Sequence, residues 1–277
     1  MWCISMLPFP LLYLFSDFVY LIVYYLIGYR KKTVRENLVL AFPNLSEAER
    51  LIIEKKSFHH LCDMFLEMAK TMTISNKEIN KRFVFTNLEV YENLEENEKS
   101  IAIMMAHYAS YEWAVSLNLK ARTEGYAIYK KLSNPYFDKL VRDIRSRFKA
   151  NLITNRETIP IIIENNKNKK IGAYGFASDQ SPRINSVFHW QNFMGTEVPV
   201  HTGAEMLAKK YNMNVVFLKV KKVKRGYYEA SIEVLSENAS IIPNYEITDQ
   251  FLKLVEKQIY EAPEYYLWTH KRWKYKR

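Results

Sequence analysis

The sequence predicts an α/β protein, with a mostly parallel or mixed sheet flanked by helices behind an N-terminal membrane helix. Residues 6–28 form a long apolar run, and residues 30–75 place apolar side chains at helical spacing. After residue 80, short β-prone runs alternate with helical segments, which is typical of an α/β domain. The expected organisation is a membrane anchor over 1–29, a helical region over 30–80 and an α/β domain over 81–277.

The composition excludes several classes of protein. The chain has 277 residues, of which 48% are hydrophobic, and this excludes a disordered chain. Its two cysteines, Cys3 and Cys62, exclude a disulfide framework. The formal net charge is +10, and the basic excess lies entirely after residue 100. This excess indicates an acidic partner: nucleic acid, anionic lipid, a phosphorylated substrate or an acidic protein.

The apolar run has the length of a membrane-spanning helix. It carries a single charge, Asp17, and about 20 apolar residues suffice to cross a bilayer. Basic residues follow it directly, and the positive-inside bias then places the body of the protein in the cytoplasm. Pro8, Pro10 and Asp17 favour a second possibility, a helix lying in the membrane interface. A buried helix of a soluble core is the third possibility.

The remaining elements follow from spacing and from capping signals. Ser46 with Glu49 forms a capping box that predicts the start of a helix. Strands are expected over 82–88, 101–106, 126–130, 151–154, 171–176, 187–193, 215–223 and 227–235. Helices are expected over 89–99, 111–120, 135–149, 159–165, 199–211 and 247–261.

The strongest candidate for chemistry is a histidine at the end of a strand. The apolar run 101–106 ends at His107, and Glu112 follows five residues later at the expected start of a helix. Ligands of α/β sheets bind outside the carboxyl ends of the strands. A histidine there can accept a proton near neutral pH, with a carboxylate to orient it. The residues alone leave two interpretations open, a base–acid pair and a histidine with a structural role.

Other catalytic motifs are missing from the sequence. There is no Gly-x-Ser-x-Gly turn, no phosphate-binding glycine loop and no His-Glu-x-x-His motif. His59 and His60 are adjacent and cannot share one face of a helix, so no metal site is expected. If His107 is a base, the nucleophile is therefore expected to come from the substrate.

Five blocks of sequence carry a resemblance to a known family. The segment from His107 to Trp113 resembles the His-x4-Asp/Glu motif of the glycerolipid acyltransferase superfamily, and most closely that of the late acyltransferases of lipid A biosynthesis, the lauroyl and myristoyl type. Four later blocks continue the pattern: Arg145-Ser-Arg147, Gly175-Phe-Ala-Ser-Asp179-Gln180, Phe193-Met-Gly195, and the closing segment 262–274.

The resemblance implies a function. It implies a cell inner-membrane enzyme that moves a fatty acyl chain from an acyl thioester of acyl carrier protein, or of coenzyme A, to a hydroxyl of a lipid A precursor. His107 then acts as general base and Glu112 orients it, with no acyl-enzyme and no cofactor beyond the thioester. Arg145 is expected to stabilise the oxyanion or to hold an acceptor phosphate. Asp179 is expected to position Arg145 or to support the histidine.

Further residues are expected to bind substrate. Basic side chains suited to an acidic carrier protein or a phosphorylated lipid occur in two clusters, which contain Lys221, Lys222 and Arg272. The family blocks add three more residues: Arg147, Gln180 and Gly195. Each basic cluster is equally explained as a solvated face. Trp268 and Trp273 in the tail suit anchoring at the membrane interface. No module or stacking platform for nucleic acid is present, so none is expected as a partner.

Two alternatives to lipid A acylation stay open. The same chemistry could act on a lysophospholipid, a glycolipid or an amino-acid lipid, because the His-x4-acid pair does not specify the hydroxyl or amine that it deprotonates. From a different class, the chain could be a membrane-docked protein that binds acyl carriers or anionic lipid without catalysis.

Overall fold

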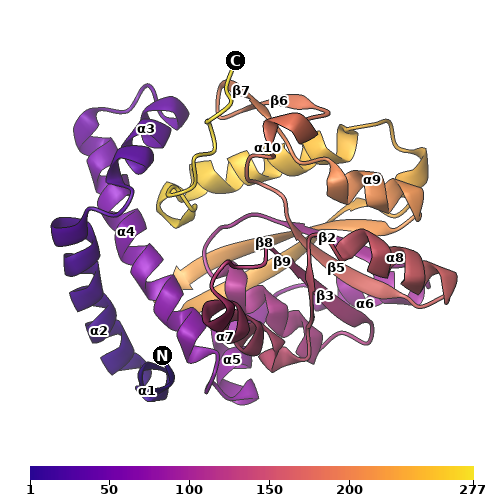
Figure 1. Ribbon diagram of the computed structural model, residues 1–277, viewed down its shortest axis with the longest axis horizontal. Coiled ribbons are helices and arrows are strands. Elements are labelled where there is room, and N and C mark those ends of the chain that lie inside the picture. Colours follow the sequence, from indigo (N-terminus) through magenta and orange to yellow (C-terminus); the bar gives the residue numbers. More distant parts are fainter.

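A seven-stranded sheet forms the centre of the protein. The computed structural model describes residues 1–277 (Figure 1). The strands lie in the order β1-β9-β8-β2-β5-β3-β4, and a separate hairpin is made by β6 and β7. Their bounds are β1 Phe83–Phe85, β2 Ile101–Met105, β3 Glu124–Tyr129, β4 Asn151–Thr154, β5 Gly172–Ala177, β6 Trp190–Phe193, β7 Thr196–Pro199, β8 Asn214–Lys224 and β9 Tyr227–Ser236. The predicted α/β class with a mainly parallel sheet is confirmed.

Five neighbouring strands run in the same direction. β8, β2, β5, β3 and β4 pair in parallel, whereas β9 is antiparallel to β8 and β1 is parallel to β9. The carboxyl ends of the five parallel strands therefore meet at one edge of the sheet. β2 lies in the middle of the sheet and its first four residues are buried, which explains its unbroken apolar sequence.

Helices cover both faces of the sheet. Figure 1 shows α9 and α10 above the sheet and α5 and α6 below it. The α-helices are α1 Trp2–Met6, α2 Phe9–Leu21, α3 Lys31–Ala41, α4 Glu47–Lys70, α5 Asn76–Arg82, α6 Leu88–Glu96, α7 Pro135–Arg145, α8 Thr158–Lys167, α9 Gly203–Lys210 and α10 Glu246–Glu261. Short 3₁₀ helices span Tyr111–Leu119, Ser146–Phe148, Ile184–Ser186, Ala239–Ile241 and Pro263–Tyr265.

Most of the expected elements are present, and the capping box of Ser46 and Glu49 is formed at the start of α4. Three bounds differ from the expectation. The strand expected over 82–88 spans only Phe83–Phe85, and the strand expected from residue 187 begins at Trp190. The helix expected from residue 199 begins at Gly203, because Pro199 still belongs to strand β7. The β6–β7 turn explains this, since Met194 and Gly195 both have positive φ, at 52° and 77°, as a two-residue hairpin requires.

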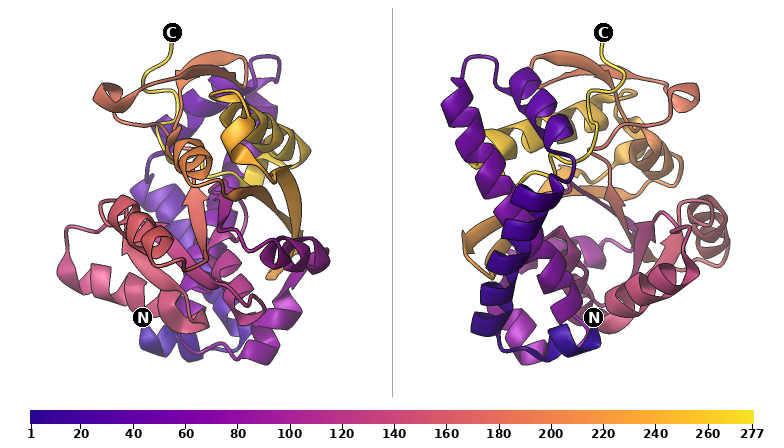
Figure 2. Two further views of the ribbon diagram at one scale, coloured as in Figure 1. Left: turned by 90° about the vertical axis from the view of Figure 1, so that its right-hand side faces the viewer. Right: turned by 60° about the vertical axis from the view of Figure 1, so that its left-hand side comes forward.

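The predicted apolar helix is formed, and it lies against the body of the protein. α2 continues as a π-helical segment, Ile22–Ile27, and ends at Gly28 with φ of 65°. Phe9–Ile27 is the one helix that is long and apolar enough to cross a membrane by length and composition. Figures 1 and 2 show α2 running alongside α4 at one side of the molecule.

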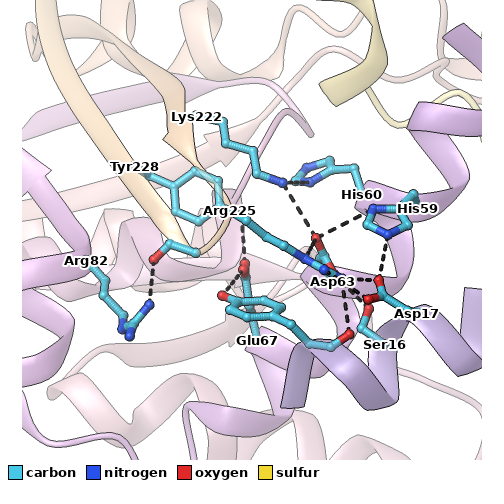
Figure 3. A network of polar contacts seen from close by, with 12 residues as sticks. Ser16, Asp17, His59, His60, Asp63, Glu67, Arg82, Lys222, Arg225 and Tyr228 are labelled. Carbon is cyan, nitrogen blue, oxygen red and sulfur yellow. Dashed lines mark hydrogen bonds and ion pairs between the residues drawn. The ribbon is translucent and has the colours of Figure 1, made fainter. Parts of the chain in front are cut away.

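A buried carboxylate of α4 fastens this helix to the sheet (Figure 3). Asp63 is fully buried and accepts a hydrogen bond of 2.7 Å from Ser16 Oγ of α2. Arg225, in the β8–β9 turn, donates to the same carboxylate at 2.7 Å and to Asp17 of α2 at 2.5 Å. The ammonium of Lys222 lies 3.7 Å from Asp63. One cluster thus joins α2, α4 and the β8–β9 hairpin.

A second buried carboxylate, Glu67, lies one helical turn further along α4. It accepts hydrogen bonds of 2.8 Å from Tyr13 of α2 and from Tyr228 of β9. Burial raises the pKa of Glu67 to about 7, and the nearby Lys222 opposes this shift. Each carboxylate oxygen of Glu67 thus accepts one hydrogen bond from a tyrosine, and these bonds compensate for its burial.

The tail of the chain is part of the core. Trp268 and Trp273 are buried, and their rings stack 6.0 Å apart. Trp268 Nε1 donates to the carbonyl of Pro263 at 2.6 Å. The expectation that these tryptophans anchor the chain at a membrane interface was wrong, because both rings are enclosed by protein.

We predict that Asp63→Ala lowers the free energy of unfolding by about 3–5 kcal/mol, because it leaves Arg225 and Lys222 without their buried partner. Asp143→Ala is the matched control, since its pair with Lys139 is exposed and is worth about 0.5 kcal/mol or less. Chemical denaturation in detergent, followed by tryptophan fluorescence, measures both. Equal losses in the two variants would contradict the role given to Asp63.

Candidate active site

The catalytic candidate His107 is presented by the loop that follows β2. The parallel pairing with β5 places Met105 opposite Ala177, and Ser178 N donates to Met105 O at 3.2 Å just beyond it. His107 and Asp179 each lie two residues beyond this pair, so the adjacent strands β2 and β5 place them side by side. Ala109 has φ of 49°, which turns the chain sharply after the histidine.

His107 and Asp179 form a close pair. His107 Nδ1 lies 2.7 Å from Asp179 Oδ1, and the backbone N–H of His107 donates to the same oxygen at 3.0 Å. Because an ionised carboxylate only accepts, Nδ1 carries the proton and Nε2 is the basic nitrogen. Tyr111 packs edge-on against the imidazole, with 5.0 Å between the ring centroids.

Glu112 does not contact the imidazole. Its carboxylate receives two hydrogen bonds from Arg145, from Nε at 2.7 Å and from Nη2 at 2.5 Å. The structure thus places Asp179, and not Glu112, against the imidazole, which agrees with one of the two roles expected of Asp179. The third nitrogen of Arg145, Nη1, makes no hydrogen bond and is free to meet a ligand. The site therefore contains two separate acid–base pairs.

The pKa of His107 lies above its ordinary value. Burial lowers this pKa, but the charge of Asp179 and its hydrogen bond more than offset that effect, and the charge of Glu112 adds to them. Burial also tends to raise the pKa of Asp179, yet the partnership with His107 keeps it below its ordinary value. The pair is thus arranged to stabilise a protonated imidazole.

The tail of the chain braces the histidine loop. Leu267 N donates to the carbonyl of His107 at 3.1 Å, and Ala109 N donates to the carbonyl of Tyr265 at 2.9 Å. Tyr108 and Tyr266 form an antiparallel bridge between these two bonds. The closing block of the sequence motif therefore fixes the loop that carries His107.

A cavity of about 1070 Å³ opens beside this loop. Four of the predicted site residues line it: His107, Glu112, Arg145 and Gln180. Asp179 lies behind His107 and is buried. Much of the remaining wall is apolar and comes from the sheet and its neighbouring helices, including Ile103, Met105, Val115, Ile128, Phe176 and Leu207. Such a wall suits a long aliphatic chain.

Three residues predicted to bind substrate do not line the cavity because they have structural roles. Lys222 is held between Asp63 and His60. Arg272 is buried, and its Nη1 donates to the carbonyl of Pro199 at 3.0 Å. Gly195 provides the positive φ of the β6–β7 turn. The structure therefore does not bring these three residues to the cavity wall.

Two further predicted binding residues are also absent from the cavity wall. Arg147 is exposed and donates to the carbonyl of Ile74 at 3.4 Å. Lys221 is an exposed residue of β8 whose register partner is Glu229. Neither side chain reaches the space beside His107.

Sequence reasoning missed three cations that do line the cavity. Lys130, Arg156 and Arg183 follow β3, β4 and β5 respectively, all on the carboxyl-end side of the sheet. Their side chains are exposed and have no carboxylate within ion-pair distance. The sequence contained a signal that could have identified these cations. Each of them follows an expected strand, and the carboxyl ends of these strands meet at the edge of the sheet that also carries His107. His201 and His270 line the same cavity.

The arrangement can take a proton from a bound hydroxyl. Nε2 of His107 is the free nitrogen of a ring that lines the cavity, and neither cysteine of the chain lines it. No hydroxyl or thiol of the protein is bonded to the imidazole, so the histidine has no protein nucleophile to activate. No group of three His, Cys, Asp or Glu side chains is arranged to hold a metal ion.

The comparisons with known proteins agree with this chemistry. Residues 1–275 match the family described as bacterial lipid A biosynthesis acyltransferase. The lipid A biosynthesis lauroyltransferase of Escherichia coli is 25% identical over 99% of this chain and 89% of its own length. A lipid A biosynthesis acyltransferase of Haemophilus influenzae is 25% identical over 97% of this chain and 86% of its own. The palmitoleoyltransferase of Escherichia coli is 23% identical over 99% and 88%. The chain therefore belongs to the bacterial lipid A biosynthesis acyltransferase family and is an O-acyltransferase.

Proposed function

We propose that this protein transfers a fatty acyl chain from an acyl thioester of acyl carrier protein to a hydroxyl of a lipid A precursor at the cytoplasmic face of the inner membrane. The observation that carries the proposal is the His107–Asp179 pair, which presents a basic nitrogen to a large and mostly apolar cavity. Family membership supports acyl transfer, and the names of the relatives support the acceptor.

The reaction follows from the position of the base. His107 Nε2 takes the proton of the acceptor hydroxyl as its oxygen attacks the thioester carbonyl. The tetrahedral intermediate then collapses, the carbon–sulfur bond breaks, and the imidazolium returns the proton to the departing thiolate. Asp179 acts through His107, because it fixes the tautomer and stabilises the imidazolium.

Arg145 is placed to stabilise the oxyanion. Glu112 holds its Nε and Nη2, which fixes the plane of the guanidinium and leaves Nη1 to donate a hydrogen bond. Burial tends to lower the pKa of Arg145, but its pairing with Glu112 raises it above the ordinary value. The donor is therefore permanently charged, which suits it to a developing negative oxygen.

The cations of the cavity suit a phosphorylated acceptor. Lys130, Arg156 and Arg183 offer three unpaired positive charges, and the one carboxylate of the cavity wall, Glu112, is paired with Arg145. Guanidinium groups bind phosphate through two parallel hydrogen bonds. We assign these three residues to the phosphate of the acceptor or of the phosphopantetheine arm of the donor.

We predict that His107→Ala lowers the rate of acyl transfer by about 10²–10⁴-fold, because a general base contributes about that factor. The assay uses the detergent-solubilised enzyme with labelled acyl thioesters of carrier protein and of coenzyme A. A tetra-acylated lipid A precursor and a lysophospholipid serve as parallel acceptors. A donor-only reaction measures thioester hydrolysis.

Each outcome of that assay distinguishes the alternatives. Transfer to the lysophospholipid alone would retain the mechanism and overturn the acceptor. Transfer from coenzyme A alone would overturn the donor. If the folded His107→Ala variant keeps the full rate, this histidine is not the base. If neither acceptor is acylated from either donor, both acceptors are excluded and the proposed function is overturned.

We predict that Asp179→Asn lowers kcat on the order of 10⁴-fold, because the imidazole loses its tautomer and its counter-charge. The variant also shifts the pH profile. A base must be neutral to act, and Asp179 raises the pKa of His107, so activity rises with pH through a value above that of an ordinary histidine. Without Asp179, burial dominates and the acid limb of kcat/KM moves to lower pH.

Glu112→Gln is the matched variant for this profile. Glu112 acts on the imidazole only through its charge and makes no hydrogen bond to it. The acid limb of kcat/KM is therefore expected to move less in Glu112→Gln than in Asp179→Asn. A larger shift for Glu112→Gln would show that Glu112, and not Asp179, is the partner of the histidine.

We predict that Arg156→Ala with Arg183→Ala raises KM for a phosphorylated acceptor about tenfold or more, since each lost charge-assisted hydrogen bond costs about 1.5–3 kcal/mol. kcat is expected to stay within about threefold, and KM for a dephosphorylated acceptor to change little. Lys221→Ala is the control, because this exposed lysine lies outside the cavity. Equal KM values in the double variant and the control would exclude these arginines from substrate binding.

A further inference from the structure

We infer that α2 binds the membrane in the plane of one anionic leaflet while it stays docked on α4, and that it does not cross the bilayer. This inference rests on the membrane attachment proposed above, but it does not depend on the acyl-transfer reaction. It concerns the surface formed by Phe9–Ile27 and the kind of lipid environment that this surface fits.

The outer face of the helix is entirely apolar. Its exposed residues repeat at intervals of three and four, which forms a continuous stripe along the helix: Leu11, Leu14, Phe18, Leu21 and Tyr25, followed by Leu26 and Ile27. On the helices of a soluble protein the polar residues face water and the apolar ones face the core. Here the arrangement is reversed, so the stripe is suited to lipid.

Four polar residues of the same helix make hydrogen bonds to the body of the protein. Tyr13 donates to Glu67, Ser16 donates to Asp63, and Tyr24 donates to Glu54 of α4 at 2.8 Å. Asp17 pairs with Arg225, and it lies 2.7 Å from Nε2 of His59 (Figure 3). The helix is therefore held along most of its length, and not only by its connection at Gly28.

Crossing the membrane would require all of these contacts to break. The helix of 19 residues would span about 28 Å, close to the hydrocarbon thickness of about 30 Å. Asp17 would then lie near the middle of the bilayer, where a charged side chain is strongly disfavoured. Asp63 would meanwhile lose the hydrogen bond from Ser16, and Arg225 would lose Asp17, although these two residues would keep each other. When α2 is docked on α4, Asp17, Asp63 and Arg225 all keep their ion pairs.

Positively charged residues next to the stripe indicate the charge of the lipid headgroups that this surface fits. Arg30, Lys31 and Lys32 follow the helix directly, and no acidic residue precedes Glu36 on that side. Arg30 and Lys32 are exposed. A row of cations beside an in-plane apolar helix favours anionic headgroups.

Two cleavable tags test the orientation. One tag with a site for a sequence-specific protease is placed before Met1 through a flexible linker, and a second one is placed after Arg277. The full chain is reconstituted in sealed vesicles of phosphatidylethanolamine and phosphatidylglycerol, and the protease is added outside. An in-plane helix leaves both ends on the same side, so each molecule loses both tags or neither.

A spanning helix gives a different product. The two ends then lie on opposite sides, and molecules that have lost only one tag accumulate in either orientation. Detergent must release both tags in every sample, which controls for sites that the protease cannot reach. Singly cut protein in sealed vesicles would overturn the inference, whereas acyl transfer measured in detergent would be unaffected.

Flotation of the protein with the same vesicles tests the stripe. Leu14→Gln with Phe18→Gln is expected to reduce the floated fraction at least tenfold, and wild type is expected to float less with vesicles lacking phosphatidylglycerol. The control is Ile241→Gln with Phe188→Gln, whose side chains are 74% and 75% exposed, compared with 66% and 57% for the stripe pair. If both variants float as wild type does, the stripe is not the lipid-binding surface.

Discussion

The buried carboxylates of α4 join the N-terminal helices to the central sheet. A charge that leaves water must be compensated nearby, and Asp63 obtains its compensation from Arg225 and Lys222 of the β8–β9 hairpin. The hairpin is in turn part of the central sheet, where β8 pairs with β2. β2, the strand that leads into the His107 loop, therefore pairs directly with β8, the strand that leads to Arg225 and so to α2.

The candidate active site separates two tasks that a single acid could not perform together. A carboxylate that orients an imidazole must lie at Nδ1, whereas one that holds a guanidinium needs both oxygens in the plane of Arg145. Asp179 fills the first position from the loop after β5, and Glu112 fills the second from the 3₁₀ helix after β2. Both acids lie near the base and raise its pKa, but only Asp179 touches it.

The sequence was informative where one local property decides the structure. The apolar run of β2, the capping box at Ser46 and the helical spacing of α4 each follow from neighbouring residues, and the structure contains all three. The family resemblance was confirmed by the comparisons. Spacing along the chain favoured Glu112 as the partner of His107, whereas the contact is made by Asp179, for which support of the histidine was one of two expected roles. The parallel register of β2 and β5 decides that contact, and no local pattern encodes it.

Basic residues were the hardest to place. Lys222 and Arg272 carry the same charge as Arg183, yet the first two are buried beside internal oxygens and only the third faces the cavity. Whether such a side chain is buried or faces the cavity depends on which carboxylates and carbonyls lie near it in the folded protein. Trp268 and Trp273 illustrate the same limit, because an aromatic residue near a basic tail suits a membrane surface and a core equally well.

The brace between the chain's tail and the histidine loop has a consequence for the order of events during synthesis. Tyr265 and Leu267 lie within the last thirteen residues, and they supply the bonds that hold both sides of the His107 loop. These residues are synthesised long after β2, and chains generally fold from the N-terminal side as they are made. The loop that carries His107 therefore becomes fixed only late in synthesis, well after its own strand has been made.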